Sequence, residues 1–191
     1  MVEVRQVVNT IFRSCSYVIA HGGESWLVDC GDVDSLLPLL DGTLRGVLLT
    51  HAHYDHIYGL NLLSDMFPSL PVFTNEAGRE ELLSDKLNLS RYVGDPFVLN
   101  HPENIRLLKD SDNVPLFDGI TATAVFTPGH CPSCVTWVMD DAIFTGDSFI
   151  PGVKTVTNIP NSDKNVAAIS ENCIRALSAH RVVYAGHAPE M

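Results

Sequence analysis

The motif THAHYDH at residues 50–56 restricts the possible folds more than any other part of this sequence. Its threonine ends the apolar run LRGVLLT, which is typical of a buried strand. In extended backbone, residues two apart point the same way, so His51 and His53 can bind one metal ion together. Asp55 and His56 are adjacent and can diverge toward a second ion, about 3.5–4 Å from the first. The fold must therefore bring the end of a buried strand to a metal site.

Three further side chains of ligand type stand in similar settings. His130 follows FTPG, Asp147 follows IFTG, and His187 follows VYAG. Each segment is an apolar run that ends in a glycine, where the backbone can turn and approach other groups closely. The recurrence predicts that three more strands deliver ligands to the same edge of a sheet.

The order of predicted elements indicates an α/β fold with two packed sheets and helices on their outer faces. Strands are expected at residues 2–8, 17–20, 26–29, 44–50, 72–74, 105–109, 120–126, 135–139, 142–145 and 182–184. Helices are expected at residues 34–40, 57–66, 76–83 and 163–177. On the last helix, the predicted buried face carries Val166, Ile169, Cys173 and Leu177. Residues 88–103 have no clear period and are expected to form a loop.

Size and charge narrow the function classes. A chain of 191 residues fits one domain, here residues 1–191. The net charge of −11 and the scattered 12 lysines and arginines argue against nucleic acid and favour a small-molecule substrate. No apolar run approaches the roughly 20 residues that span a membrane, and no signal peptide is visible. Five cysteines, an odd number, fit a reducing compartment, and we expect a cytoplasmic protein.

In the order HxHxDH, PGH, TGD and GH, these motifs resemble those of the metallo-β-lactamase-fold hydrolases along nearly the whole chain. The resemblance implies an αββα sandwich with two metal ions at one edge of the sheets. It also implies how the ligands are divided between the ions. The first ion would be bound by His51, His53 and His130, the second by Asp55, His56 and His187, with Asp147 bridging.

Imidazole and carboxylate ligands suit zinc best, and also manganese or iron. Two divalent ions less two aspartates leave about two positive charges, which favour an anionic substrate or a developing oxyanion. A water bridging the ions is expected to lose a proton near neutral pH and attack a carbonyl. Asp55 is the expected catalytic residue, since it can orient that water and carry a proton to the leaving group.

The segments TPGH, FTGDS and VYAGHAP look most like those of glyoxalase II-like hydrolases, which cleave thioesters such as hydroxyacylglutathione. Those enzymes carry a C-terminal domain that binds glutathione, whereas this chain stops four residues past His187. The expected substrate is therefore a small thioester or ester. True β-lactamases of this fold do not use a bridging aspartate where Asp147 stands, which argues against that activity.

Three other functions stay open. Lactonases of the same fold resemble the same seven-ligand pattern. Sulphur dioxygenases share the fold and bind one iron, for which His51, His130 and Asp147 would suffice, to oxidise a persulfide. A non-catalytic metal-binding module is the third, although the intact set that includes Asp55 argues against it.

Several residues near the motifs allow two interpretations. Cys131 and Cys134 are either structural thiols or a redox switch beside His130. The side chains of Tyr54, Tyr92 and Lys154 either contact substrate or have only structural or solvated roles.

Overall fold

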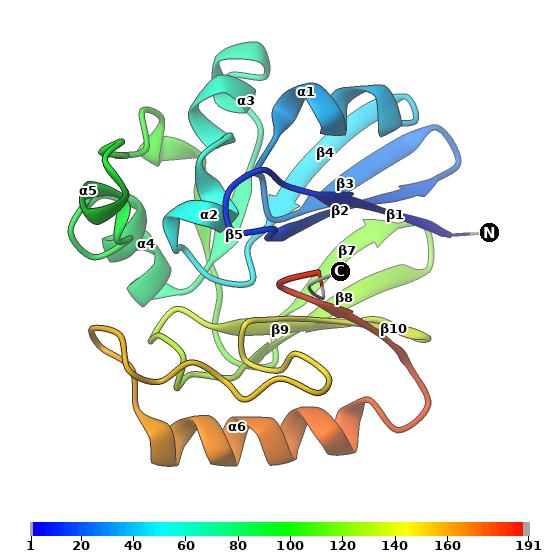
Figure 1. Ribbon diagram of the computed structural model, residues 1–191. Coiled ribbons are helices and arrows are strands. Elements are labelled where there is room, and N and C mark those ends of the chain that lie inside the picture. Colours follow the sequence, from blue (N-terminus) through cyan, green and yellow to red (C-terminus); the bar gives the residue numbers. More distant parts are fainter. Residues whose placement is uncertain (1, 189–191) are drawn as a thin grey trace.

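Two mixed β-sheets pack face to face in the computed structural model, which describes residues 2–188 (Figure 1). The first sheet has the strand order β1-β2-β3-β4-β5-β6, with β1 to β3 antiparallel and β3 to β6 parallel. Its strands are β1 (Glu3–Val8), β2 (Cys15–His21), β3 (Glu24–Val28), β4 (Thr43–Leu48), β5 (Val72–Thr74) and β6 (Ile105–Leu107).

The second sheet has the order β11-β10-β9-β8-β7, in which only β10 and β11 are parallel. Its strands are β7 (Asn113–Phe117), β8 (Ile120–Phe126), β9 (Val135–Val138), β10 (Ala142–Gly146) and β11 (Val182–Ala185). The two sheets are joined at one end, where the backbone N–H of Cys15 donates to the carbonyl of Gly186 at 2.7 Å.

Helices cover the outer faces of both sheets (Figure 1). The helices are α1 (Val33–Leu36), α2 (Tyr54–Ile57), α3 (Leu60–Met66), α4 (Glu76–Leu82), α5 (Ser90–Val93) and α6 (Lys164–Leu177), with short 3-10 turns at Leu37–Leu39 and Pro102–Asn104. The group α1 to α4 lies beyond the first sheet and α6 beyond the second (Figure 1). The predicted αββα sandwich is confirmed.

The apolar runs of β2 and of the second part of β4 are buried on both faces. In β2, Tyr17 and Ile19 belong to the core between the sheets, while Val18 packs into the core beneath the helices. In β4, Leu48 faces the other sheet and Val47 faces the helices. A strand covered on both faces has no polar side, which is why these segments read as continuous rather than alternating apolar runs.

The strand β7 was missing from the sequence prediction. It pairs only with β8 and contains Pro115, which an edge strand tolerates but which hides the strand signal. The expected loop at residues 88–103 contains α5 and a 3-10 turn, and the expected helix at residues 57–66 begins earlier, at Tyr54, and is interrupted near Gly59. Residues 34–40 form α1 followed by a 3-10 turn rather than one helix.

The predicted buried face of α6 was wrong in part, since Leu177 packs against the cluster that contains Ile174 but other members of that face do not. Ala167, Ser170 and Ile174 are buried, whereas Ile169 is 70% exposed and Cys173 is exposed. The helix lies close to the loop after β8, where a side chain at Gly129 would collide with the backbone of Ala167. Small residues therefore set this face, and hydrophobicity alone does not reveal it.

Among residues 2–188, no helix combines the length and the apolar character that crossing a bilayer requires.

Candidate metal centre

Four loops carry the predicted ligands to one edge of the sandwich. They follow β4, β8, β10 and β11, two of which are neighbours in the second sheet. Their donor atoms form three overlapping groups, within each of which all atoms lie within 4.8 Å of one another. The groups are His51, His53 and His130; His51, His56 and Asp147; and Asp55, His56 and His187. The structure thus brings all seven predicted ligands together.

Local backbone geometry explains this convergence. His53 is extended and immediately precedes α2, so Asp55 and His56 lie on the first turn of that helix. Gly146 has a φ of +49°, a conformation that favours glycine, and turns the chain so that Asp147 enters the site. At Gly186 an added side chain would collide with the Asp147 carboxylate. The glycines before the ligands therefore serve the close approaches that the sequence predicted.

Four of the histidines have their outer ring nitrogen fixed by an oxygen acceptor. Nδ1 of His56 donates to Asp29 at 2.9 Å, Nδ1 of His130 to the carbonyl of Val156 at 3.0 Å, and Nδ1 of His187 to the carbonyl of Phe12 at 2.9 Å. Nδ1 of His51 lies 3.2 Å from the hydroxyl of Thr50, which donates its own proton to Asp29 and so accepts from the ring. Each ring consequently presents Nε2 toward the centre, which is how histidine ligands are oriented in metal sites.

Two buried atoms at the centre have no hydrogen-bond partner among residues 2–188: Nε2 of His51 and Oδ1 of Asp147. Nδ1 of His53 and Nε2 of His130 also face each other at 3.0 Å. Buried polar atoms are seldom left unpaired, because each costs about 1–3 kcal/mol. A divalent cation would satisfy these atoms, and a donor set of imidazole and carboxylate groups suits zinc, manganese or iron.

Two members of the first group, His51 and His53, are held in the neutral form. Burial, together with the neighbouring His56 and His53, pulls the pKa of His51 well below its ordinary value. Burial and the adjacent His130 lower the pKa of His53 to about 3. Neutral imidazole is the form that binds metal, so protons compete little with a metal ion for these two rings.

In the third group, the carboxylates of Asp55 and Asp147 raise the pKa of both histidines. Burial lowers the pKa of His187, but its hydrogen bonds to Asp147 and Asp55 outweigh burial and raise that pKa to about 10. The same balance, with Asp55 the largest contributor, raises the pKa of His56 well above its ordinary value. Burial raises the pKa of Asp55, but the charge of His56 and the hydrogen bond with His187 outweigh it, so the carboxyl stays ionised. Before a metal binds, this group therefore holds an ionised Asp55 beside the protonated rings of His56 and His187.

Two buried carboxylates behind the ligands were not found from the sequence. Asp29, 1% exposed, accepts hydrogen bonds from His56 and from both the backbone and the hydroxyl of Thr50. Glu81, 4% exposed, accepts a very short hydrogen bond from Ser133, whose hydroxyl also accepts the backbone N–H of Ala52. Asp29 follows an apolar run, as the ligands do, and that signal could have identified it. Glu81 lies inside α4, where its spacing carries no signal.

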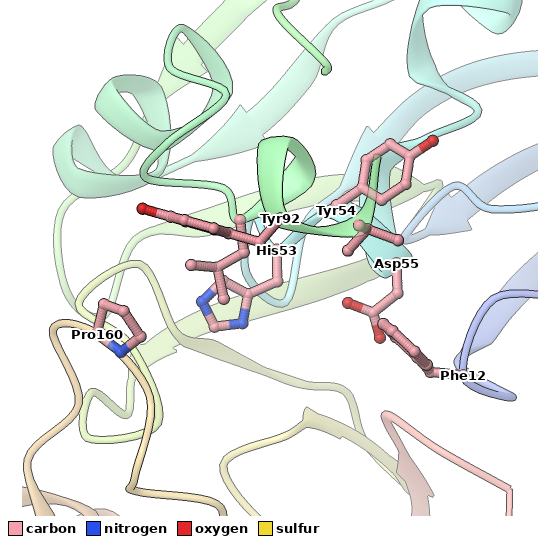
Figure 2. Close-up of a pocket in the computed structure, with 8 residues that line it drawn as sticks. Phe12, His53, Tyr54, Asp55, Tyr92 and Pro160 are labelled. Atoms are coloured by element: carbon pink, nitrogen blue, oxygen red, sulfur yellow. The ribbon is translucent and has the colours of Figure 1, made fainter. Parts of the chain in front are cut away.

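A cavity of roughly 420 Å³ opens beside the ligands (Figure 2). Its lining residues are Phe12, His53, Tyr54, Asp55, Leu89, Tyr92, Val93 and Pro160. The hydroxyl of Tyr54 points away from His53 and Asp55 (Figure 2) and donates to Asp95 at 2.7 Å. Tyr54 is thus held mainly by packing, Tyr92 stands at the cavity, and the exposed Lys154 is not part of this lining. Phe12 was not predicted, because its segment carries no motif.

The thiols of Cys131 and Cys134 lie 3.4 Å apart, and both side chains are buried. Burial and the neighbouring thiol raise the pKa of Cys131 well above its ordinary value. The thiol form is therefore favoured, and this supports a structural role over that of a reactive thiolate.

Residues 10–187 match the family model described as the metallo-beta-lactamase superfamily. A probable metallo-hydrolase of Streptococcus pyogenes serotype M6 is 28% identical over 99% of this chain and 85% of its own length. A hydroxyacylglutathione hydrolase of Hydrogenovibrio crunogenus is 26% identical over 88% of the chain, and the match spans only 55% of that relative.

Solved structures give the same family. The BLEG-1 B3 metallo-beta-lactamase superposes with a TM-score of 0.86 at 28% identity, covering 98% of this chain and 92% of its own. A second protein, solved in a di-iron-bound form, gives a TM-score of 0.80 at 25% identity and covers 97% of this chain and 92% of its own.

Proposed function

Because the chain belongs to the metallo-beta-lactamase superfamily, we propose that it is a binuclear metal-dependent hydrolase of a small thioester or ester. The observation that carries the proposal is the complete donor set, in which Nε2 of His51 and Oδ1 of Asp147 are buried without a hydrogen-bond partner among the described residues. Zinc is the proposed metal, and the relative solved with two irons makes iron the main alternative.

When bound, two divalent ions would activate water and stabilise the negative charge that develops on the carbonyl oxygen. The protein's own contribution centres on Asp55. Its carboxylate lies 3.3 Å from Nε2 of His187 and 3.5 Å from Nε2 of His56, and it borders the cavity. Since Asp55 is ionised at neutral pH, it can accept a proton from the attacking water and return it to the leaving thiolate or alkoxide.

The first experiment is the metal content of the purified protein per chain and by element, followed by a substrate panel. About two ions per chain and turnover of thioesters or esters would support the proposal. The panel includes a glutathione thioester, lactones and β-lactams. The glutathione thioester is included because one relative is named a hydroxyacylglutathione hydrolase, and the β-lactams because one solved neighbour is named a metallo-beta-lactamase. One iron per chain with persulfide oxidation, or no metal uptake at all, would refute it.

We also propose a reducing compartment such as the cytoplasm. Cys131 and Cys134 are free thiols that are buried next to each other. This fits an environment in which disulfides do not persist. Fractionation of the native source tests this, and recovery of the protein in a secreted fraction would contradict it.

A further inference from the structure

The cavity beside the ligands combines one polar end with an apolar wall. At the polar end stand His53 and Asp55, and Figure 2 shows both beside the rim residues Phe12, Tyr92 and Pro160. The wall consists of Phe12, Leu89, Tyr92, Val93 and Pro160. These residues come from three separate segments, the loop after β1, the region of α5 and the loop before α6, so their meeting is a property of the fold.

Several wall side chains are exposed although they are large and apolar. Phe12 is 66% exposed, Tyr92 65% and Val93 43%. Single exposed apolar residues are ordinary, but a group around a concave site next to ligand-type residues is typical of a binding surface. The wall therefore has the composition to cover an apolar part of a bound molecule.

The wall is preformed by contacts with the ligand loops. Phe12 has a φ of +51°, unusual for a bulky residue, and its carbonyl accepts the hydrogen bond from His187. On the other side, the backbone N–H of Tyr54 donates to the carbonyl of Asn88 at 2.9 Å. The buried Asn88 amide donates in turn to the carbonyls of Glu81 and Phe97, which fixes the segment that carries α5. The wall is thus tied to the same residues that position the ligands.

Charge decides between two kinds of substrate group. The eight lining residues include the acidic Asp55 but no lysine and no arginine. An extended anionic group such as glutathione, with its two carboxylates, would contact apolar side chains at this wall without a cationic partner among the lining residues. Burial of unpaired charge costs free energy. A hydrocarbon group gains free energy from the same contact, in proportion to the area that it buries.

We propose that this wall binds an uncharged hydrocarbon group attached next to the scissile bond, so that the substrate is an apolar thioester or ester. The inference rests on the proposed function, because the scissile carbonyl must lie at the ligand end for the hydrocarbon group to reach the wall. The group belongs either to the acyl side or to the leaving side, and the two sources are separated by experiment.

The test uses the metal-loaded full chain and two substrate series. One series extends a straight acyl chain from two to eight carbons with one aryl thiol as leaving group, and the other keeps acetyl and extends an alkyl thiol. Burial of each methylene should raise kcat/KM about three- to fourfold, the ratio that corresponds to about 0.8 kcal/mol, in one series and not in the other. A succinyl thioester of matched length should be turned over more slowly than the butyryl thioester.

The substitution Tyr92→Ala should reduce the ratio of kcat/KM between the longest and shortest substrates about tenfold. Ile169→Ala on α6, which removes a similarly exposed side chain that is not among the lining residues, should leave that ratio unchanged. Circular dichroism and metal content of both variants establish that they are folded and loaded.

Binding of alkyl hydroxamates, measured by calorimetry, separates failure of the inference from failure of the proposed function. Turnover with no dependence on chain length in either series, or a preference for the succinyl substrate, would overturn the apolar wall and leave the hydrolase intact. No turnover of any ester, with hydroxamate affinity that still rises with chain length and falls in Tyr92→Ala, would overturn the hydrolase and leave the wall.

Discussion

The two halves of the site hold their histidines in opposite electrostatic settings. His51, His53 and His130 form an imidazole half, in which burial and mutual repulsion keep His51 and His53 neutral. Asp55 and His56, with His187, form a carboxylate half, in which acidic neighbours raise the pKa of both histidines. His51 and His53 can therefore bind a cation without losing a proton, whereas His56 and His187 must release protons to bind one.

A buried carboxylate supports each half, but at different distances from the ligands. Asp29 contacts the ring of His56 directly and so belongs to the carboxylate half. Glu81 bonds to Ser133 and lies next to the backbone of Ala52, between His51 and His53, so it supports the imidazole half without touching a ring. Asp29 therefore acts on ligand rings, directly at His56 and through the Thr50 hydroxyl at His51, whereas Glu81 acts on Ser133 and on the backbone between two ligands.

The largest predicted effect concerns Asp55, the one ligand-type carboxylate that borders the cavity. Asp55→Asn should lower kcat about 10²- to 10⁴-fold with little change in KM, because the amide cannot carry the proton between water and leaving group. Steady-state kinetics on the same substrate, with metal content measured in parallel, check this. Turnover intact with a raised KM would show that Asp55 only binds substrate.

The next largest effect concerns Glu81 and the stability of the imidazole half. Burial, partly offset by the Ser133 hydrogen bond, raises the pKa of Glu81 from 4.5 to about 7. A raised pKa means that the folded state binds this proton more tightly than the unfolded state. The associated stability is therefore present below pH 4.5 and is lost as the pH rises through 7.

For the Glu81 carboxyl this loss amounts to about 3 kcal/mol. In Glu81→Gln the free energy of unfolding should not show this decrease. The difference in that free energy between the variant and the wild type should therefore change by about that amount, in favour of the variant, between pH 4.5 and pH 8. Urea unfolding of metal-loaded protein across this range measures it. The exposed neighbour Glu80→Gln is the matched control and should follow the wild type. Parallel curves for Glu81→Gln and the wild type would contradict the argument.

The main parts of the fold could be predicted because its strands are buried on both faces and its ligands follow strand ends. The runs before His51 and Asp147 show both features, whereas the partly exposed edge strand β11 before His187 shows only the second. The edge strand β7 contains a proline and pairs on one side only, so it lacks that signal. On α6 the buried face is set by close contact at Ala167 and by the hydrogen bond of Ser170 to the carbonyl of Pro128, which hydrophobicity does not report.

The parts of the site that sequence could not supply depend on partners far apart in the chain. Phe12 meets His187 across 175 residues, and Glu81 meets Ser133 across 52. Neither spacing has a period, and neither residue type is diagnostic alone. The seven candidate ligands, which the structure brings together, could be proposed from the sequence because four of them share one short motif, which gave the other three a context.

A smaller effect is expected for Asp29, which orients the carboxylate half. In Asp29→Asn the amide oxygen can keep the Thr50 backbone N–H, which leaves the amide nitrogen facing Nδ1 of His56. That nitrogen would donate to Nδ1 and move the ring proton to Nε2, where it blocks the ligand position. The affinity for the ion bound by His56 should fall about 10- to 100-fold, and the affinity for the ion bound by His51 should fall less, because Asp29 reaches His51 only through Thr50.

Calorimetric titration of the metal-free variant with zinc measures the two affinities. The matched control is Asp32→Asn, since Asp32 bonds to Thr10 and Tyr58 rather than to a ligand. Equal weakening of both ions in Asp29→Asn would mean that the halves are not separate units.

The pH dependence of metal binding gives the smallest effect per step and the most direct test of the comparison. His187, with its pKa raised to about 10, holds a proton at neutral pH that a metal ion must displace. Affinity at the carboxylate half should therefore rise about tenfold per pH unit for each displaced proton between pH 6 and pH 8. His53, whose pKa is lowered to about 3, has no proton to release over this range, so affinity at the imidazole half should change far less.

Zinc titrations against a chelator, with proton release counted in buffers of different ionisation enthalpy, separate the two slopes. Equal slopes would show that the ligands share their protons as one cluster, and the division into an imidazole half and a carboxylate half would then describe geometry but not energetics.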